Sequence, residues 1–466
     1  MEEKKKFRFK MPNTLALIFF TIVLVALCTW IIPGGEYERV EKNGKEITVA
    51  GSFKYTEHNP QSIQILTAPI KGFKEGAGII VFLLVIGGAF CVIQETGAVT
   101  SFINKAALIL GKNKYLRVLF IPVIMTIFSL GGAVFGMCEE TLPFILIFVP
   151  LAVSLGYDSL VGVAIPFLGA AAGFGGAFFN PFTVGIAQNF AGIPLYSGLE
   201  YRIIIWIITT TVTITFVMLY AGKIYKNPNL SPVHDLDKLR KDKIEKDQTI
   251  EAEVTFRHKL VLSIFVLGMV VLIYGILKWQ WYIEEIAALF LALGLICGIA
   301  GGLDSDKIAK AYANGAKDMI NPILIIACAK AILIIAVDGK ILDTILYFLS
   351  NFISRFPPVI TAWLMFYVQC IINFFVHSGS GQAALTIPIM APLSDLTGIT
   401  RQTSVLAFQL CELVNPVLPT SAVTMGVLGL AVIPWGRWVR WMMPLLIFYC
   451  ILSMALLIWP VLTGWQ

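Results

Sequence analysis

Residues 136–183 constrain the fold most, because long apolar segments there enclose two adjacent glutamates, Glu139 and Glu140, and the helix-breaking pair Asn180-Pro181. The apolar segments are too hydrophobic to lie in water. Polar groups and broken backbone are costly at membrane depth, and they are tolerated where they line a cavity or a binding site. We therefore expect the functional site of this protein to include this stretch.

The composition supports a membrane setting for the whole chain. Of the 466 residues, 57% are hydrophobic and only 14% are charged, and the mean hydropathy is +0.81. Such a chain cannot hide its apolar surface in a water-soluble domain, so it predicts an all-α polytopic membrane protein. The net charge of +6 comes from basic residues at segment ends, which is the positive-inside pattern of membrane proteins and does not indicate nucleic-acid binding.

A series of landmarks occurs twice, in the same order and at similar spacing. The pairs are 72–75 with 315–318, 95–97 with 337–339, Gly136-x4-Thr141-x-Pro143 with Gly381-x4-Thr386-x-Pro388, and Asn180-Pro181 with Asn415-Pro416. No single pair is significant, because glycine and proline are common. Together they predict an internal duplication, with repeat 1 at 13–222 and repeat 2 at 283–466.

Basic residues set the expected orientation. The N-terminal residues 1–12 and the basic linker 223–259 are expected in the cytoplasm, and the C-terminus outside. The segment 34–60, with Asn43-Gly44 between strand-like runs, predicts an external β-hairpin flap. If the short apolar segments are counted as spans, the sequence predicts about thirteen crossings plus two segments that enter and leave by one side.

One unpaired helix at 260–282 would turn the second copy upside down. Two inverted-topology repeats are typical of secondary transporters, whose site lies near the midplane between broken helices. We therefore predict a transporter.

Within each repeat we expect a re-entrant helical hairpin followed by a broken transmembrane helix. The hairpins are predicted at 136–158 and 378–398, each as two half-helices that meet at a tip, and the broken helices at 159–191 and 401–432. Proline removes a backbone amide and disfavours helix at the residue before it. The freed carbonyls could hold Na⁺, and the amide ends could face anionic groups.

These breaks define the candidate site. The expected substrate contacts are Glu139, Glu140, Thr141, Asn180, Thr183, Ser378, Ser380, Gln382, Glu412 and Asn415. A coupling Na⁺ is expected near Asn180, Asn415, Thr420 and Ser421.

Several alternatives stay open for the site residues. The proline breaks could be kinked helices without a ligand. The glutamates could be protonated buried acids, partners of Lys330, or residues at headgroup level. His377 is interpreted as a helix-end residue rather than a proton relay.

Searches for catalytic motifs find no Gly-x-Ser-x-Gly elbow, no His-Glu-x-x-His and no Gly-Lys-Ser/Thr loop. The chain also offers no large soluble domain for a nucleotide. We therefore expect neither an enzyme nor an ATP-driven pump, and no cofactor beyond a coupling Na⁺ or H⁺.

The Gly-Met-x-Glu-Glu run at 136–140, the two Asn-Pro breaks and the basic central loop resemble, over nearly the whole chain, the YfcC-like branch of the anaerobic C4-dicarboxylate carrier family. The resemblance implies a bacterial inner-membrane carrier of the wider ion-transporter superfamily, with inverted repeats. Many members of that superfamily are dimers that move their substrate by an elevator motion. Members of this branch are proposed to be basic amino-acid antiporters.

The hairpin tips of the family then fall near 139–141 and 378–382, and the unwound positions near 180–183 and 415–421. Dicarboxylate relatives have Ser-Asn-Thr at the tips, whereas this chain has Cys-Glu-Glu-Thr and Ser-Gly-Ser-Gly.

The acidic residues bear on the substrate. Burying a dianion beside Glu139, Glu140 or Glu412 would cost several kcal/mol unless cations or protons compensated. The same carboxylates suit the guanidinium or ammonium of arginine, ornithine or lysine. We therefore favour a basic amino acid, exchanged or coupled to Na⁺ or H⁺. A C4-dicarboxylate is the alternative, with the glutamates protonated or binding Na⁺ and Lys330 meeting the substrate.

Overall fold

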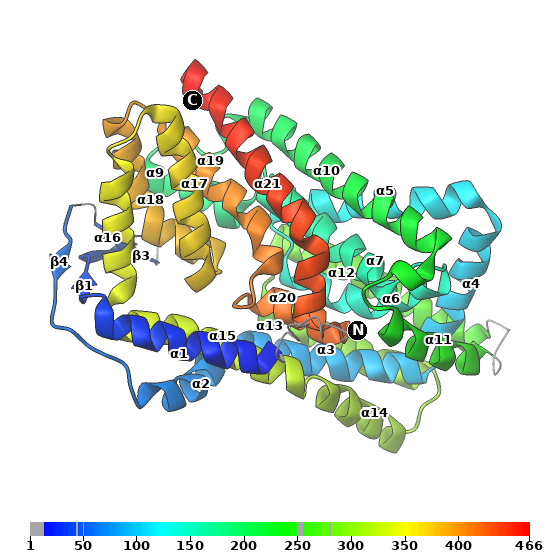
Figure 1. Ribbon diagram of the computed structural model, residues 1–466. Coiled ribbons are helices and arrows are strands. Elements are labelled where there is room, and N and C mark those ends of the chain that lie inside the picture. Colours follow the sequence, from blue (N-terminus) through cyan, green and yellow to red (C-terminus); the bar gives the residue numbers. More distant parts are fainter. Residues whose placement is uncertain (1–13, 43–44, 50, 249–254, 280) are drawn as a thin grey trace, which may run out of the picture.

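The computed structural model describes residues 14–42, 45–49, 51–248, 255–279 and 281–466. These residues are mostly helical, and their few strands lie between the first two helices (Figure 1). Nine described helices are long and apolar enough to cross a membrane, and three shorter apolar helices accompany them. The expected polytopic helical architecture is confirmed. The predicted cytoplasmic N-terminus, residues 1–12, lies outside the described residues.

The first half contains ten helices, interrupted by short 3-10 and π segments, and two strand pairs. In order they are α1 (Thr14–Ile31), β1 (Gly35–Glu36), β2 (Arg39–Lys42), β3 (Lys45–Thr48), β4 (Lys54–Tyr55), α2 (Gln64–Glu75), α3 (Ala77–Glu95), α4 (Ala98–Lys112), α5 (Lys114–Phe135), η1 (Glu139–Thr141), α6 (Leu142–Ser154), α7 (Ser159–Val163), η2 (Ala164–Leu168), α8 (Gly169–Gly175), η3 (Pro181–Gly185), α9 (Ile186–Ala191) and α10 (Leu199–Lys226).

The second half repeats this order of helices after a connecting segment. It comprises η4 (Pro228–Leu230), α11 (His234–Gln248), α12 (Phe256–Trp279), α13 (Ile283–Ala300), α14 (Ser305–Asp318), α15 (Ile320–Asp338), α16 (Ile341–Ile353), α17 (Pro358–Phe375), α18 (Gly379–Leu396), α19 (Arg401–Cys411), η5 (Glu412–Val417), α20 (Ala422–Leu430) and α21 (Trp435–Thr463). Helices α1 to α6 correspond to α13 to α18, and each series ends in a broken helix and a long final helix.

The packing of the two halves is reciprocal. Helix α3 packs against α13 and α14 of the second half, and its counterpart α15 packs against α1 and α2 of the first. Glycines allow both close approaches. A Cβ at Gly72 in α2 would lie 2.1 Å from the Ala327 carbonyl oxygen, and one at Gly315 in α14 would lie 2.1 Å from that of Gly87. The duplicated glycine landmark therefore marks the same kind of helix contact in each half.

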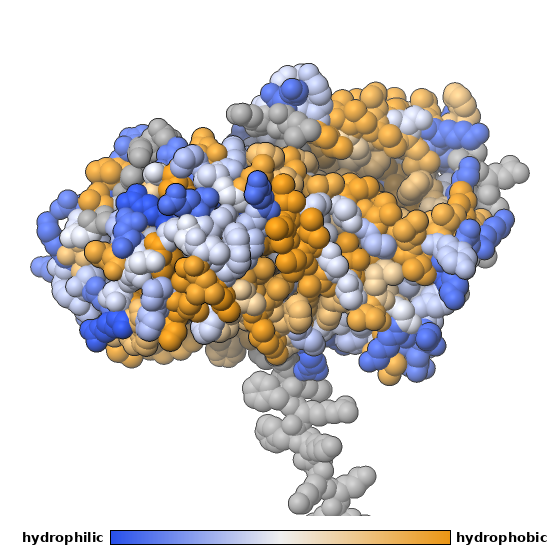
Figure 2. Space-filling view, turned by 90° about the horizontal axis from the view of Figure 1, so that it is seen from above, coloured by the Kyte–Doolittle hydropathy of each residue, from blue (hydrophilic) through white to orange (hydrophobic). Residues whose placement is uncertain are grey.

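The equivalent helices α2 and α14 lie at opposite ends of the molecule. Helices α1, α15 and α3 form a row, with α2 beneath its left end and α14 beneath its right end (Figure 1). Seen from above, hydrophobic residues cover much of the middle of the surface, and the most hydrophilic residues mostly gather toward the left and right (Figure 2). A membrane would therefore surround the middle of this view.

Strands β2 and β3 pair antiparallel, with Arg39 opposite Thr48, at the place where the Asn-Gly pattern predicts a hairpin. Residues 43 and 44 of its turn lie outside the described part of the chain. The flap is held to the second half because Arg39 Nη2 lies 2.8 Å from Asp343 Oδ2 in α16. Its predicted external location stays a prediction.

The structure corrects the expected limits of both helical hairpins. Residues 136–158 contain a short 3-10 turn and a single helix, α6, and residues 378–398 contain a single helix, α18. Proline at the first turn of α6 fits a helix start, and Pro388 and Pro392 lie inside α18 without ending it. A re-entrant hairpin in either repeat would therefore take the preceding helix, α5 or α17, as its first arm and the turn before α6 or α18 as its tip.

The linker predicted at 223–259 is also shorter than expected, because α10 runs to Lys226 and α12 begins at Phe256. Part of it packs against the protein rather than being a solvated connector. Ser231 Oγ donates to Asp158 Oδ2 over 2.7 Å, and Asp237 accepts from the Ser159 amide over 2.8 Å. The unpaired helix expected at 260–282 is α12, which begins at Phe256 and ends at Trp279. Residue 280 lies outside the described residues.

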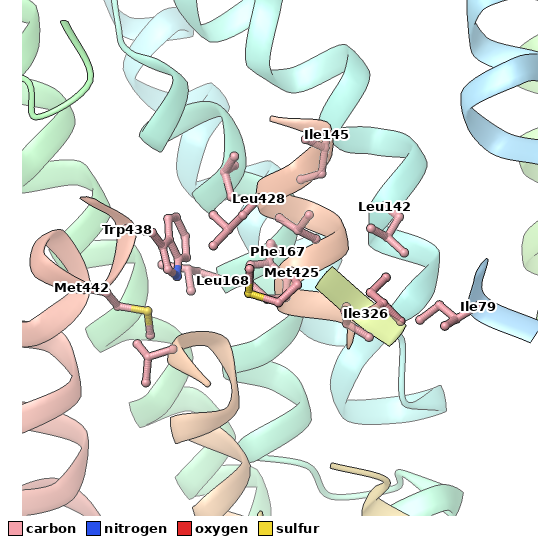
Figure 3. Packing of buried hydrophobic residues seen from close by; sticks show 14 of the residues in the cluster. Ile79, Leu142, Ile145, Phe167, Leu168, Ile326, Met425, Leu428, Trp438 and Met442 are labelled. Carbon is pink, nitrogen blue, oxygen red and sulfur yellow. The ribbon is translucent and has the colours of Figure 1, made fainter. Parts of the chain in front are cut away.

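The hydrophobic core joins the two halves. Leu142 and Ile145 of α6 lie close to Met425 and Leu428 of α20, and Trp438 of α21 closes one side of the cluster (Figure 3). All of these side chains are buried. Phe167 and Leu168 of the first broken helix belong to the same cluster, so the core joins the two broken helices.

Candidate functional site

The turn after α5 positions the two adjacent glutamates. Gly136 ends α5 with a φ of +72°, which favours glycine. The following residues bond to one another: Glu140 Oε2 accepts from the Cys138 amide over 2.9 Å, and Thr141 Oγ1 donates to the Cys138 carbonyl over 2.6 Å. Glu139 and Glu140, both held on this compact turn, line the same cavity.

The turn after α17 supplies hydroxyls and backbone amides. Ser378 is the N-cap of α18, and its Oγ accepts from the Gly381 amide over 3.2 Å. His377 precedes it and bonds through Nε2 to Thr420 Oγ1. The N-terminus of a helix carries free amides and a partial positive charge, so this end of α18 suits an anionic group.

The two Asn-Pro breaks have different local structures. Asn180 is fully buried, and its Oδ1 accepts from the amides of Phe182 and Thr183 at the start of η3. Asn415 lies inside η5, and its Nδ2 donates to Glu412 Oε2 over 3.1 Å. Among the described residues, Asn180 Nδ2 and Thr183 Oγ1 at the first break and Glu412 Oε1 at the second are buried without a hydrogen-bond partner. Both breaks therefore offer buried polar atoms to a ligand.

A cavity of about 350 Å³ lies between these four segments. Of the predicted residues, the structure brings together around it Glu139, Glu140, Ser378, Ser380, Glu412, Asn415 and Ser421. It places Thr141, Asn180, Thr183, Gln382 and Thr420 outside the cavity lining.

Two of the outlying residues contact the lining from behind. A Cβ at Gly136 would lie 2.7 Å from Asn180 Oδ1, and one at Gly379 would lie 2.6 Å from Thr183 Cγ2. Gln382 instead turns into the hairpin, where its Nε2 donates to the Gln369 carbonyl over 2.9 Å. Asn180 and Thr183 thus support the two turns, and Gln382 joins α18 to α17.

Other lining residues were missed or given a different role by the sequence analysis. Glu75 ends α2, Tyr282 precedes α13, and Lys330 lies midway along α15. Glu75 belongs to a duplicated landmark, and Lys330 is a lone lysine in an apolar segment, so the sequence marks both as candidate site residues. Nothing in the sequence around Tyr282 distinguishes it. These residues come from helices outside the hairpins, which only the tertiary fold brings to the site.

The cavity has more acids than bases. Glu75, Glu139, Glu140 and Glu412 line it together with one lysine, Lys330. The ion pairs between described residues all lie elsewhere. Four carboxyl groups beside one lysine favour a ligand that brings positive charge, because such a ligand supplies charge-assisted hydrogen bonds.

The comparisons with known proteins bear directly on this site. Residues 11–462 match the family described as C4-dicarboxylate anaerobic carrier, DcuC. The chain belongs to this family. It is 37% identical over 510 residues to the Escherichia coli (strain K12) protein named "Putative basic amino acid antiporter YfcC", with 100% of this chain and 99% of that protein covered. The resemblance to the YfcC-like branch is thereby confirmed.

Further relatives lie at lower identity. A Haemophilus influenzae protein without a functional name is 28% identical over 488 residues, covering 95% of each chain. Among solved structures, the Alcanivorax borkumensis YdaH transporter has a TM-score of 0.41 at 16% identity, covering 97% of this chain and 100% of that one. The Neisseria gonorrhoeae MtrF efflux pump has a TM-score of 0.41 at 17% identity, with 96% and 95% covered. The family establishes a multi-pass membrane transporter.

Proposed function

We propose that this protein is a secondary active transporter of the bacterial inner membrane that carries a basic amino acid of the arginine, ornithine or lysine type. The observation that carries this proposal is the single cavity in which Glu139, Glu140 and Glu412 face the N-terminus of α18. The relative named as a basic amino acid antiporter supports the same substrate class.

The two ends of a basic amino acid match the two sides of this cavity. Its guanidinium or ammonium group would meet the carboxylates of Glu139, Glu140 and Glu412. Its α-carboxylate would meet Ser378, Ser380 and the free amides of α18. A dicarboxylate would place a second negative charge beside the glutamates, which is unfavourable in a buried cavity.

The alternative substrate is a C4-dicarboxylate, as the family's description indicates. Lys330, His377 and the α18 N-terminus would then receive the two carboxylates. The glutamates would have to be protonated or to bind Na⁺. Lys330 is the lining residue that favours this alternative.

Transport would proceed by alternating access, as exchange or coupled to Na⁺ or H⁺, with two inverted repeats and an elevator motion. The repeated order of helices, their reciprocal packing, and the opposite placement of α2 and α14 support inverted repeats. For a coupling Na⁺ both breaks stay candidates. Thr183 Oγ1 at the first break and Glu412 Oε1 at the second are buried oxygens without a hydrogen-bond partner among the described residues. Thr420 is bonded to His377, and Ser421 caps α20.

The proposal also includes a cytoplasmic N-terminus, an external C-terminus and a homodimer. The orientation rests on the basic residues of the linker, and the dimer rests on the resemblance to the superfamily.

A competition panel tests the substrate. Arginine, ornithine, citrulline, succinate and fumarate would each compete with radiolabelled arginine for the purified protein, and the panel would be repeated with Glu139→Gln and Glu140→Gln. We expect arginine and ornithine to compete and the glutamine variants to lose this preference. Citrulline keeps the shape of arginine without its charge, so it is the matched control. If the purified protein binds no radiolabelled arginine but binds radiolabelled succinate, unchanged in both variants, the dicarboxylate carrier is supported instead.

A further inference from the structure

A second and larger cavity lies outside the proposed transport site. It measures about 1170 Å³ and is lined by α4, α5, α6 and α12, with Ser263 as its one polar side chain. We call this cavity the α5–α12 groove. Its lining includes side chains that are open to the surroundings, such as Ile127 at 58% and Val266 at 60% exposed. An apolar groove of this kind in a membrane helix bundle is filled by hydrocarbon rather than by water.

The length of the groove matches one leaflet of a bilayer. Along α12 its lining runs from Val261 to Ile273, which is about 18 Å at the rise of an α-helix. Half of a typical hydrocarbon core is about 15 Å. The groove is therefore long enough for one extended acyl chain and not for a whole transmembrane helix.

One end of the groove is basic. Arg257 and Lys259 lie in the first turn of α12, directly before the lining residue Val261, and both are exposed. Ser101 of α4 bonds to His258 over 3.0 Å, which brings α4 and its exposed Lys105 to the same end. Within the described part of the chain, Lys105, Arg257 and Lys259 form no ion pair.

The other end of the groove reaches the transport site. Helix α5 begins beside α4, and Met137 follows its far end. Met137 lines both the groove and the site cavity, and it precedes Glu139 by two residues. An acyl chain in the groove would thus lie between α12 and the hairpin arms α5 and α6, with its tip against the acidic turn.

We propose that the α5–α12 groove binds an acyl chain of an anionic phospholipid from the surrounding bilayer, with its headgroup on Lys105, Arg257 and Lys259. Hydrocarbon fills the dry groove, and the clustered cations select a negative headgroup. This proposal concerns lipid binding alone, so its outcome is independent of which solute is transported.

Lipid analysis of the purified full chain tests the proposal. The protein is extracted from bacterial membranes in a mild detergent, and the phospholipids that stay bound are quantified by mass spectrometry. We expect a phosphatidylglycerol-class lipid to remain with the wild-type protein. Val270→Trp would fill the groove and remove this lipid, because Val270 is exposed and lines it. Val118→Trp on α5 is the matched control, because Val118 is exposed but outside the lining.

The headgroup contacts are tested separately. Lys105→Gln and Lys259→Gln should weaken the preference for phosphatidylglycerol over phosphatidylethanolamine by about fivefold per charge, since each basic residue near an anionic surface contributes about 1 kcal/mol. Equal retention of lipid by wild type and Val270→Trp, or an unchanged preference after both lysine substitutions, would overturn the proposal.

A measurement on the wild-type protein covers the case in which a variant does not fold. Phosphatidylglycerol with a photoactivatable acyl chain should cross-link to peptides of α5, α6 and α12 in excess over α10 and α21. Labelling spread evenly over all of these helices would also overturn the proposal.

Discussion

The two turns that face the site cavity occupy equivalent positions in the two halves but carry different chemistry. The turn between α5 and α6 presents Glu139 and Glu140, and the turn between α17 and α18 presents Ser378 and Ser380 at a helix N-terminus. One side of the cavity is therefore negative, and the other offers hydroxyls and free amides. Two turns at equivalent positions can therefore bind the two ends of one ligand when those ends differ in charge.

The two Asn-Pro breaks behind these turns also differ in what their asparagines contact. Asn415 donates a hydrogen bond to Glu412 and lines the cavity. Asn180 instead accepts hydrogen bonds from two backbone amides of η3 and lies behind Gly136. The second break thus contributes to the ligand cavity, and the first break supports the acidic turn. The two halves have divided their roles although their helices follow one order.

The largest expected effect concerns the orientation of the halves. If they are inverted, a single cysteine introduced at Gln466 should react with a membrane-impermeant reagent from outside, and one at Lys238 in α11 only after the cells are opened. A cysteine-free background removes the native thiols. Labelling of both positions from the same side would refute the inverted repeats and leave the transporter family unaffected.

The chemical difference between the turns predicts two kinds of binding defect. Glu139→Gln with Glu140→Gln should weaken arginine binding by about 2–5 kcal/mol, the usual cost of removing one partner of a buried charge pair, and leave citrulline less affected. Ser378→Ala with Ser380→Ala should weaken arginine and citrulline alike, by about 1 kcal/mol for each lost hydrogen bond. Calorimetric titration of the purified variants measures both.

Equal losses for the two ligands in the glutamine variant would contradict the division of roles between the turns. Unchanged binding in the serine variant would remove the α18 N-terminus from the site.

The sequence predicts the glutamates and Asn-Pro pairs of the site better than the lining residues that come from other helices. The helix-breaking pairs and the glutamates are visible because they interrupt apolar segments, so Glu139, Glu140, Glu412 and Asn415 could be found directly. The limits of α6 and α18 could not be found from the sequence, because proline near the start of α6 or within α18 does not force a break. Tyr282 reaches the cavity through tertiary packing, which no local pattern in the sequence indicates, whereas Lys330 is visible as a lone lysine in an apolar segment.

The close fit of the first turn predicts opposite stability effects at two glycines. Gly136→Ala should destabilise the protein by about 1–2 kcal/mol, because a positive φ is unfavourable for alanine and its Cβ would meet Asn180 Oδ1 at 2.7 Å. Gly381→Ala should be neutral or raise stability by up to about 1 kcal/mol, since Gly381 lies in the first turn of α18 with no Cβ contact shorter than 3.3 Å.

Thermal unfolding in detergent, monitored by intrinsic fluorescence, compares the two glycine variants with the wild type. A lower midpoint for Gly381→Ala than for Gly136→Ala would contradict the placement of the strained turn in the first half.

The two asparagines should separate stability from binding. Asn180→Ala removes the side-chain acceptor of two amides and should cost about 1 kcal/mol of stability, with arginine affinity unchanged. Asn415→Ala should weaken binding, because Asn415 holds Glu412 at the cavity. Uptake into proteoliposomes should fall in both. Wild-type uptake by both variants would leave the breaks a structural role only.

The smallest effect is expected at the contact between the linker and α21. Arg437 Nη2 donates to Asp235 Oδ2 over 2.9 Å, and both side chains are well exposed. The hydrogen bond from Arg437 lowers the pKa of Asp235 below its ordinary value. A carboxylate with a lowered pKa stabilises the fold above its unfolded pKa, and this contribution is lost as the pH falls through the folded pKa.

Asp235→Asn should therefore lower stability by less than about 1 kcal/mol, as for other exposed ion pairs. The deficit should be constant from pH 6 to 8 and shrink in high salt, because salt screens exposed charges. Thermal unfolding of wild type and Asp235→Asn at several pH values measures it, with Glu38→Gln in the exposed Lys54–Glu38 pair as the control. A deficit of several kcal/mol, or one that grows between pH 6 and 8, would mean that the linker holds the two halves through a buried contact instead.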